Sequence, residues 1–199
     1  MIRSNKRMTL FDLAMNYAIE KHSGQTRKLV QTPYILHPRE VAAIVGTMTD
    51  DLETLAACVL HDTVEDTDAT LEEIEELFGK RVMLIVMTET EEKRPNLPPA
   101  ATWKLRKEET LNMLQNTKDL AVKMLWLGDK VSNLRSFARE YRQQGDKLWL
   151  QLNQRDPKQH EWYYRSIGRC LSDLKEYDAY REYMELVDIV FGPEKKEDA

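Results

Sequence analysis

Glycine and proline are scarce in this sequence, with seven residues of each among 199. A protein built from many short strands needs a turn every few residues, and glycine and proline supply most turns. The shortage therefore argues against a many-stranded β protein and favours long helices. Hydrophobic residues at 42% and charged residues at 32% are ordinary for a globular protein, and this length allows a stable core without disulfides.

The sequence also lacks an excess of positive charge. Lysine and arginine number 29 against 34 aspartate and glutamate residues, which gives a net charge of −5. Proteins that bind nucleic acids normally present a dense basic surface, so we expect no nucleic-acid partner. A polyanionic substrate would have to be bound by a local basic cluster or by a metal ion.

Long apolar runs and paired cysteines are missing as well. No stretch of about 18 apolar residues is present, so we expect no membrane-spanning helix. The basic N-terminus is not followed by an unbroken apolar segment, as a signal peptide would be. Cys58 and Cys170 lie far apart in apolar-periodic segments and are expected to be reduced core thiols. These features predict a cytoplasmic protein; they leave its oligomeric state open, and a homo-oligomer is compatible with them.

Apolar residues recur at helical spacing almost throughout the chain. We predict an all-α fold, with a single bundle of roughly eight to ten helices over residues 1–192 and a charged tail at residues 193–199. Residues 91–101, which include three prolines, form the best candidate for a mobile flap. Helices are expected near residues 10–22, 38–48, 51–63, 71–78, 82–88, 103–114, 118–142, 159–174 and 179–190.

Four titratable residues follow directly on one strongly apolar helix. His61, Asp62, Glu65 and Asp66 come after residues 56–60, which are all apolar. If the helix continues or turns tightly, His61 and Glu65 share a face, as do Asp62 and Asp66. Bringing such groups together is costly unless they are paired or bind a metal. For His61 and Asp62 alone, a hydrogen-bonded helix terminus is an equally good explanation.

A second apolar stretch, residues 121–128, ends at Asp129, and Asn133 follows one turn later on the same face. A carboxylate at the end of a buried run is suited to be a remote metal ligand. Imidazole nitrogens and carboxylate oxygens both bind divalent cations. Because several costly polar groups need one common explanation, the pattern favours a metal site.

Basic residues stand near the loops that flank these segments. Arg27 and Lys28 follow the first expected helix and could hold phosphate oxygens beside a metal. Exposure to solvent is the commoner role for such a pair. The same two alternatives apply to the basic residues around the proline-containing loop, which are Lys93, Arg94, Arg106 and Lys107.

Four ordered motifs resemble the HD-domain superfamily, and within it the alarmone hydrolases of the RelA/SpoT type, most closely their small single-domain members. The resemblance covers roughly residues 11–137 and implies a helical HD-domain bundle. Four motifs in order are a specific signal, whereas a lone His-Asp pair would be weak. The motifs are HSGQTRK at 22–28, PYILHP at 33–38, LHDTVEDT at 60–67 and LGDKVSNL at 127–134.

The resemblance implies a role for each matched residue. It implies one divalent metal, manganese (Mn²⁺), with His37, His61, Asp62 and Asp129 as its ligands. Glu65 and Asp66 would orient or deprotonate the attacking water, and Asn133 would hold the ribose or its phosphate. The other implied substrate contacts are Arg27, Lys28, Lys93 and Lys107.

The implied activity is that of a metal-dependent phosphohydrolase. It would remove the 3′-pyrophosphate from guanosine tetra- or pentaphosphate, giving GDP or GTP and pyrophosphate. One alternative is an HD-type phosphohydrolase of another nucleotide or phosphate ester, and another is a nucleotide-sensing module without turnover. The chain departs from the family in one motif, which more often reads Ala-Asp-Arg-Leu-His-Asn, whereas residues 128–133 read GDKVSN. The loop at residues 28–33 lacks the usual glycine, which bears on nucleotide preference.

Overall fold

Helices make up nearly all the regular structure of this computed structural model, which describes residues 8–29, 31–90, 94 and 96–194. Within those residues the extended structure is limited to one isolated antiparallel bridge, between Thr26 and Pro33. The predicted all-α fold is therefore confirmed. The helices are α1 (Leu10–Lys21), α2 (Leu36–Val45), α3 (Leu52–Leu60), α4 (Thr63–Asp66), α5 (Leu71–Phe78), α6 (Lys80–Met87), α7 (Pro99–Asn116), α8 (Leu120–Gln144), α9 (Pro157–Cys170) and α10 (Asp178–Phe191), with 3-10 helices η1 (Gly145–Gln151) and η2 (Ser172–Leu174).

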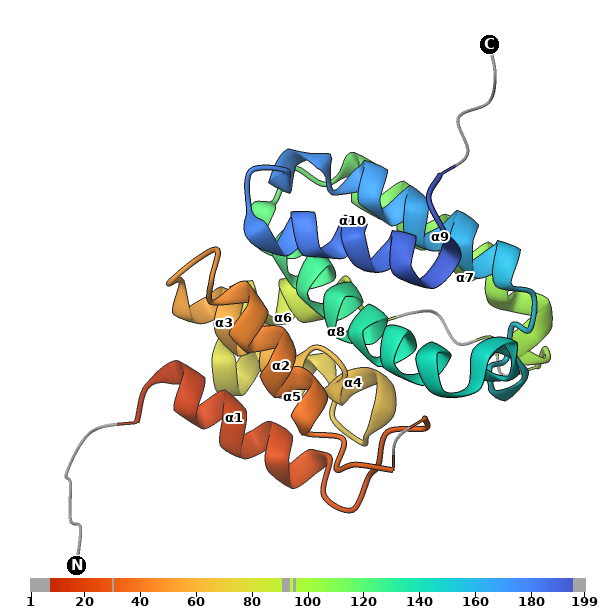
Figure 1. The fold of residues 1–199 in the computed structure, drawn as a ribbon. Helices are drawn as coiled ribbons and strands as arrows, with labels where there is room; N and C mark the ends of the chain where they lie inside the picture. The colour runs from red at the N-terminus through yellow and green to blue at the C-terminus, as the bar shows by residue number, and fades with distance from the viewer. Residues whose placement is uncertain (1–7, 30, 91–93, 95, 195–199) are drawn as a thin grey trace, which may run out of the picture.

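Helix α8 lies between two groups of helices (Figure 1). On one side α2 and α3 pack against it, α1 packs on α3, and α5 and α6 complete that group. On the other side α10 packs along α8, and α9 contacts both α10 and α7. Residues of α8 therefore face both groups, so a polar side chain in its middle can meet residues from the first third of the chain.

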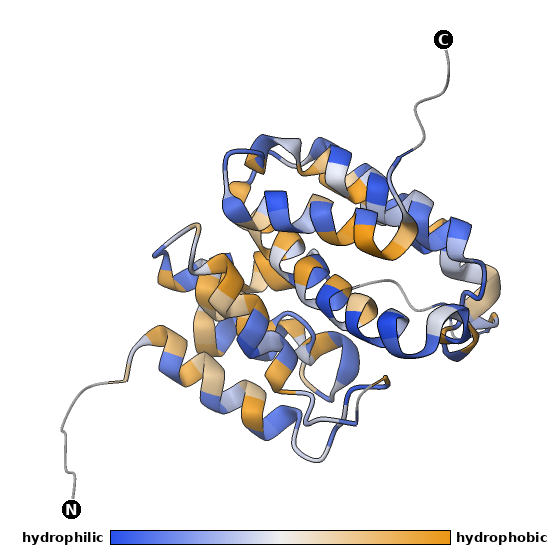
Figure 2. Cartoon of the chain, in the orientation of Figure 1, coloured by the Kyte–Doolittle hydropathy of each residue, from blue (hydrophilic) through white to orange (hydrophobic). Residues whose placement is uncertain are grey.

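The hydrophobic core runs through both groups. Leu60, Leu125 and Leu127 are fully buried, and Trp126 is 2% exposed. Burying one large apolar side chain stabilises a fold by about 1.5–3 kcal/mol. Each helix carries both apolar and polar positions, visible as alternating colours along the ribbons in Figure 2. The period of that alternation is what made the helices predictable from the sequence.

Side-chain caps define where several helices begin. Thr9 and Asp12 form a reciprocal capping box at the start of α1. Asp51, Asp119 and Asp156 accept hydrogen bonds from backbone N–H groups in the first turns of α3, α8 and α9. Each such cap stabilises its helix by about 1 kcal/mol.

A glycine in the middle of α8 allows α2 to approach closely. A Cβ atom on Gly128 would lie 2.7 Å from Val45 Cγ2 and 3.2 Å from the carbonyl oxygen of Val41. Both distances are shorter than ordinary van der Waals contacts. The close approach brings the N-terminal turn of α2, which carries His37, next to Asp129 on α8.

The structure departs from the predicted elements at the end of α3. A single helix was expected over residues 51–63, but α3 ends at Leu60 and α4 begins at Thr63. The His61 ring contacts the carbonyl of Cys58, and the Thr63 hydroxyl donates to the carbonyl of Leu60. Because these side chains take up carbonyls of the last turn, the backbone hydrogen-bond ladder stops there.

Two predicted segments lie partly outside the residues that the structure describes. The expected flap at 91–101 includes residues 91–93 and 95, and the expected tail includes residues 195–199; these positions lie outside the described part. Cys58 is a free, buried thiol as predicted, whereas Cys170 is free but only partly buried. Among the helices that the structure describes, none combines the length and apolarity needed to cross a bilayer.

Candidate metal centre and active-site pocket

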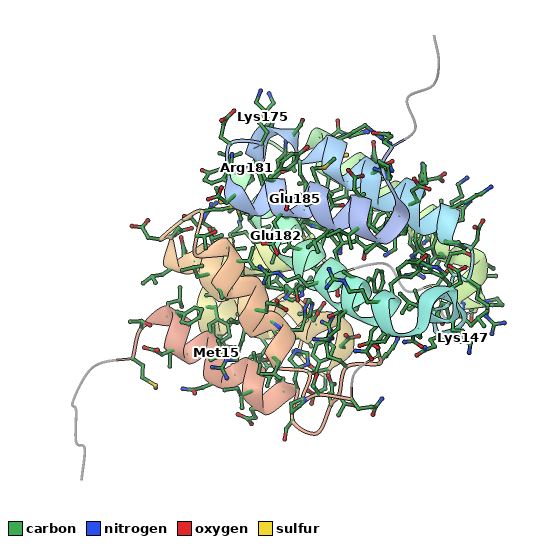
Figure 3. All side chains as sticks on the ribbon, in the orientation of Figure 1. Met15, Lys147, Lys175, Arg181, Glu182 and Glu185 are labelled. Atoms are coloured by element: carbon green, nitrogen blue, oxygen red, sulfur yellow. The ribbon has the colours of Figure 1, made fainter. Side chains whose placement is uncertain are left out.

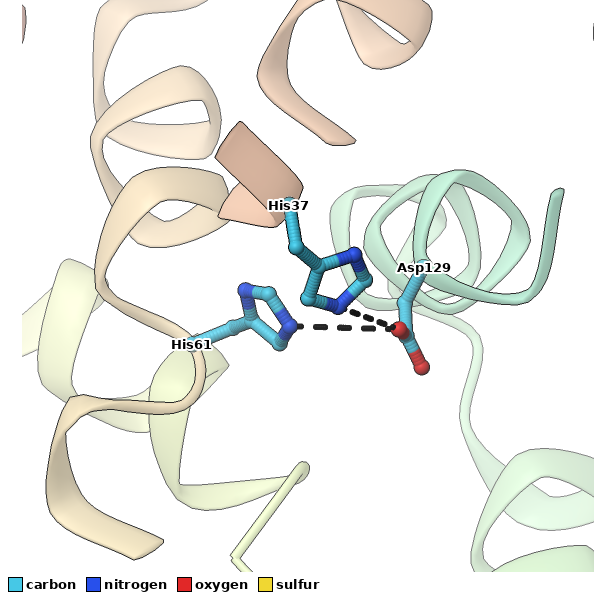
Figure 4. Close-up of side chains that lie close together, drawn as sticks. All are labelled: His37, His61 and Asp129. Atoms are coloured by element: carbon cyan, nitrogen blue, oxygen red, sulfur yellow. Dashed lines mark ion pairs between the residues drawn. The ribbon is translucent and has the colours of Figure 1, made fainter. Parts of the chain in front are cut away.

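Three potential metal ligands meet where α2, the end of α3 and the middle of α8 converge (Figure 4). His37 Nε2 lies 3.1 Å from Asp129 Oδ1, and His61 Nε2 lies 3.9 Å from the same oxygen. All three side chains are buried, and one ligand atom from each lies within 4.8 Å of the others. A cation about 2.1 Å from each ligand would hold neighbouring ligand atoms about 3.0–3.4 Å apart. The separation of 3.1 Å lies in this range, whereas His61 Nε2, at 3.9 Å, would have to move slightly closer to bind the same ion.

Asp62, the fourth ligand that the sequence predicts, lies beside this group. Its Oδ2 is 2.9 Å from His61 Nε2 and 3.5 Å from His37 Nε2. The hydroxyl of Tyr34 donates a hydrogen bond of 2.6 Å to the same oxygen. Asp62 is therefore in reach of the histidine pair, although it is not one of the three residues whose ligand atoms all lie within 4.8 Å.

The hydrogen bonds of His61 orient its Nε2 toward the carboxylates. Its Nδ1 lies 2.8 Å from the carbonyl oxygen of Cys58, which can only accept, so Nδ1 carries a proton. In the neutral ring Nε2 then presents its lone pair toward Asp62 Oδ2, 2.9 Å away, in a contact that lacks the geometry of a hydrogen bond. A buried unpaired nitrogen is costly unless it binds something. The donor set of two imidazoles and carboxylates suits a divalent cation.

The two carboxylates at the centre favour positive charge on the groups around them. Burial lowers the pKa of His61, but the carboxylates of Asp62 and Asp129 outweigh it and raise the pKa to about 10. Burial also lowers the pKa of His37, and there the nearby Asp129 offsets only part of the effect. The Lys130 ammonium and the His61 ring supply this positive charge in the metal-free protein, and a bound divalent cation would supply it in place of the His61 proton.

Asp129 is held by two neighbours on its own helix. Asn133 Nδ2 donates to its Oδ1 over 2.7 Å, and the Lys130 ammonium pairs with its Oδ2. Lys130 is buried, and its Nζ lies 4.2 Å from the centre of the Trp126 ring. A lysine makes a single-point contact where the arginine usual in this motif would make a planar one. The altered motif therefore still fixes this carboxylate.

The carboxylates predicted to manage the proton lie on α4, directly after the metal ligands. Glu65 and Asp66 both line the pocket that opens at the centre. Asp66 Oδ2 accepts from the Tyr34 hydroxyl at 3.2 Å, and its carbonyl accepts from Gln25 Nε2 at 2.8 Å. The phenol has one proton, so Tyr34 can donate to either Asp62 or Asp66 but not to both at once.

The pocket next to the ligands has a volume of about 450 Å³, within the range of small-molecule sites. Its basic wall comes from segments far apart in the sequence. Arg27 reaches across to α8, where it donates to Asn133 Oδ1 at 3.1 Å and to Ser136 Oγ at 3.3 Å. Asn133 thus links Asp129 to the basic wall. The other basic residues lining the pocket are Lys28, Arg106, Lys107 and Lys130.

The structure brings most of the predicted site residues to this one pocket. His37, Asp62 and Asp129 line it together with the α4 carboxylates, Arg27 and Asn133. Lys28 and Lys107 also line it, and Lys107 Nζ lies 5.0 Å from the centre of the Tyr163 ring. His61 lies behind them, in contact with Asp62. Lys93 falls outside the described residues.

Sequence reasoning missed Tyr34 and Glu89. Tyr34 bridges two acidic side chains, a role that no spacing rule indicates. Glu89 is 7% exposed and lines the pocket, its Oε1 has no hydrogen-bond partner, and burial raises its pKa to about 8. It follows the apolar residues 82–87, so the pattern of an acid after an apolar run, which identified Asp129, would have found it.

Comparisons with known proteins point the same way. The sequence model of the HD domain family matches residues 14–157, which is more than half of the chain. The guanosine-3′,5′-bis(diphosphate) 3′-pyrophosphohydrolase MESH1 of Danio rerio is 41% identical over 129 residues, covering 63% of this chain and 67% of that protein. The guanosine-3′,5′-bis(diphosphate) 3′-pyrophosphohydrolase of Aquifex aeolicus is 33% identical over 185 residues, which cover 86% of this chain but only 25% of the longer protein.

Two solved structures share the fold. One is a metazoan ortholog of SpoT, described as hydrolysing ppGpp and playing a role in starvation responses. It superposes with a TM-score of 0.70 and 25% identity, covering 93% of this chain and 97% of that one. The other is lmo0812 of Listeria monocytogenes, with a TM-score of 0.68, 28% identity and coverage of 79% and 99%.

Proposed function

Because the chain belongs to the HD domain family, we propose that it is a metal-dependent 3′-pyrophosphohydrolase of guanosine tetra- and pentaphosphate. The observation that carries the proposal is the position of the His37, His61 and Asp129 cluster beside a pocket with a basic wall. The names of the Danio rerio and Aquifex aeolicus relatives support the substrate. The products would be GDP or GTP and pyrophosphate.

We assign the metal to His37, His61, Asp62 and Asp129, and propose Mn²⁺ as the ion. A bound divalent cation would polarise the phosphoryl group and help to generate a nucleophile near neutral pH. The unpaired Nε2 of His61 and the carboxylate beside it support this ligand set. Tyr34, which donates to Asp62, would keep that carboxylate oriented.

We assign the proton chemistry to Glu65 and Asp66. Their positions on α4, along the pocket and next to Asp62, support a role in orienting the attacking water and accepting its proton. Asp66 is held by Tyr34 and Gln25, which favours Asp66 as the orienting group and Glu65 as the proton acceptor.

We assign substrate binding to Arg27, Lys28, Lys107 and Asn133, together with Lys93. Guanidinium and ammonium groups neutralise the charge that develops on phosphate oxygens. Arg27 is fixed against α8 by its bonds to Asn133 and Ser136, so it would offer a pre-oriented wall. A cytoplasmic location, the absence of a nucleic-acid partner and the oligomeric state stay predictions.

The experiment that tests this proposal is product identification with a substrate panel. The metal-loaded protein is incubated with guanosine tetraphosphate, GDP, GTP and other phosphate esters, and products are resolved by chromatography and ³¹P NMR. The proposal expects GDP and pyrophosphate from the tetraphosphate alone. Hydrolysis of another ester instead would favour an HD-type phosphohydrolase of that substrate, and tight binding without any product would favour a sensing module.

A further inference from the structure

Behind His37, on the side away from the other ligands, lies the hydroxyl of Ser132. Its Oγ is 2.9 Å from His37 Nδ1 and 2.7 Å from Glu40 Oε2. Ser132 is 1% exposed, so water does not compete for these contacts. Ser132 lies in the segment 128–133, where the sequence departs from the pattern of the family that it resembles.

The single proton of the Ser132 hydroxyl fixes the direction of both contacts. An ionised carboxylate only accepts, so Ser132 donates its proton to Glu40. Its oxygen must then accept from His37, which places a proton on Nδ1 of the ring. The neutral His37 ring consequently presents the lone pair of Nε2 to Asp129 and Asp62.

Glu40 is itself fixed by an ion-pair network that reaches α10. Arg135 Nη1 donates to Glu40 Oε1 at 2.8 Å, while its Nε and Nη2 donate to the two oxygens of Glu182 at 2.7 and 2.9 Å. Figure 3 labels Glu182 on α10. Although burial raises the pKa of Glu40, the hydrogen bonds from Arg135 and Ser132 bring it below its ordinary value. The carboxylate thus stays charged at neutral pH.

We propose that Ser132 and Glu40 are positioning residues that hold His37 in its metal-binding tautomer and raise the affinity of the centre for a divalent cation. The inference rests on the metal site assigned above. A ligating histidine binds more strongly when its other nitrogen donates to an anionic chain, because the ring becomes more basic and cannot rotate. Here the anion acts through a hydroxyl, and the network joins α2, α8 and α10.

The first test is the Mn²⁺ affinity of single variants, measured by calorimetry or by competition with a chelating dye. Ser132→Ala removes the acceptor behind His37, and we expect Mn²⁺ to bind about 10- to 100-fold more weakly. Glu40→Gln keeps an oxygen acceptor but removes its charge, so a smaller loss is expected. Unchanged affinity in Ser132→Ala would overturn the proposal.

The matched control is Ser136→Ala. It changes the same residue type one turn further along α8, where the hydroxyl contacts Arg27 rather than His37. The Mn²⁺ affinity of Ser136→Ala should equal that of the wild type. An equal loss of Mn²⁺ affinity in Ser132→Ala and Ser136→Ala would overturn the positioning role of Ser132. Thermal unfolding of the metal-free variants separates a general loss of fold from a specific loss of affinity.

The second test reads the tautomer directly and needs no metal. ¹⁵N NMR of the histidine rings in the metal-free protein should show the His37 proton on Nδ1 in the wild type and a shift of that population in Ser132→Ala. A wild-type ring with an unprotonated Nδ1 would overturn the proposal. Failure of the wild type to bind any divalent ion would instead overturn the metal site itself, so the two failures are distinguishable.

Discussion

At the scale of single residues, the ligands are held from behind so that one atom of each faces the same point. A backbone carbonyl holds His61, the Ser132 hydroxyl holds His37, and an amide holds Asp129. In both histidines the partner binds Nδ1 and leaves Nε2 facing the centre. At Asp129 the amide binds Oδ1, the oxygen nearest the histidines, while Lys130 pairs with Oδ2. Because these groups are buried, the arrangement is costly unless a cation completes it.

Asp62→Ala should remove both metal binding and turnover. Losing only an outer partner of a ligand weakens metal affinity by about 10- to 100-fold, and loss of a ligand should exceed that. Metal content after dialysis against Mn²⁺ and pyrophosphate release are the measurements. Asp68→Ala, which removes an exposed carboxylate paired with Lys21, is the control and should retain both. Wild-type activity in Asp62→Ala would refute the proposed ligand set.

Glu65→Gln should keep the metal and lose most of the rate. The amide preserves shape but cannot accept a proton, so turnover should fall by about 10²- to 10⁴-fold. Steady-state kinetics and metal affinity are measured on the same preparation, with the exposed Glu72→Gln on α5 as the matched control. If Glu65→Gln also lost its metal, Glu65 would be a ligand rather than the proton acceptor.

Glu89 should make the metal-free protein less stable as the pH rises. Burial raises its pKa from 4.5 to about 8, so between these values the folded state keeps a proton that the unfolded state has lost. Its contribution is therefore present at low pH and falls by up to about 1.4 kcal/mol per pH unit through that window. Denaturant unfolding of Glu89→Gln against the wild type measures it. If the free energy of unfolding fell as steeply with pH in Glu89→Gln as in the wild type, Glu89 would not be the group whose titration causes the loss.

Three of the four proposed ligands could be singled out from the residue pattern and His37 only from the family resemblance, whereas the partners of these residues could not be predicted. His61, Asp62 and Asp129 follow apolar runs, where an unpaired polar group would be costly, and that cost made them visible. Ser132 lies 95 positions from His37, so their contact exists only once α2 and α8 pack. Tyr34 was inside a recognised motif, but nothing in the motif shows that its hydroxyl reaches two carboxylates.

At the scale of helices, the contact between α2 and α8 sets the spacing of the ligands. Gly128→Ala would place a methyl group 2.7 Å from Val45 Cγ2, so the two helices must move apart. Overpacking of this kind costs about 1–3 kcal/mol, and Mn²⁺ affinity should fall because His37 moves away from Asp129. Chemical denaturation and metal titration are the measurements.

A second substitution separates this steric effect from helix propensity. Val45→Ala removes the methyl group in the clash and should restore part of the stability and metal affinity in the Gly128→Ala background. Alanine favours a helix over glycine by about 1 kcal/mol. If Gly128→Ala were more stable and bound Mn²⁺ normally, close packing at this glycine would not control the centre.

The helices themselves were largely predictable, because their apolar period is regular. The break between α3 and α4 was not, since His61 and Asp62 keep backbone angles in the helical region. The side chains of His61 and Thr63 bind backbone carbonyls in the last turn of α3, and this ends the run of helical backbone hydrogen bonds. The spacing of apolar residues does not reveal such contacts. That break turns Asp62 toward the histidines and sets α4 along the pocket.

At the scale of the whole molecule, a bound cation should stabilise the fold, because its ligands come from α2, α8 and the segment between α3 and α4. Binding to the native state alone adds about 2.7 kcal/mol at a hundred times Kd. Mn²⁺ should therefore raise the Tm of the wild type but not of Asp62→Ala, as calorimetry would measure. An equal rise in the Tm of the wild type and of Asp62→Ala would mean that the ion binds at another site.

The domain boundary at residue 192 stays a prediction.

The most direct test of the central claim is pyrophosphate release from guanosine tetraphosphate by metal-stripped protein during titration with Mn²⁺. We expect no release without metal, and release that rises with Mn²⁺ and saturates near one ion per chain, with GDP as the co-product. Two results would contradict the proposed function: pyrophosphate release that does not depend on added metal, or no pyrophosphate release from a protein saturated with Mn²⁺.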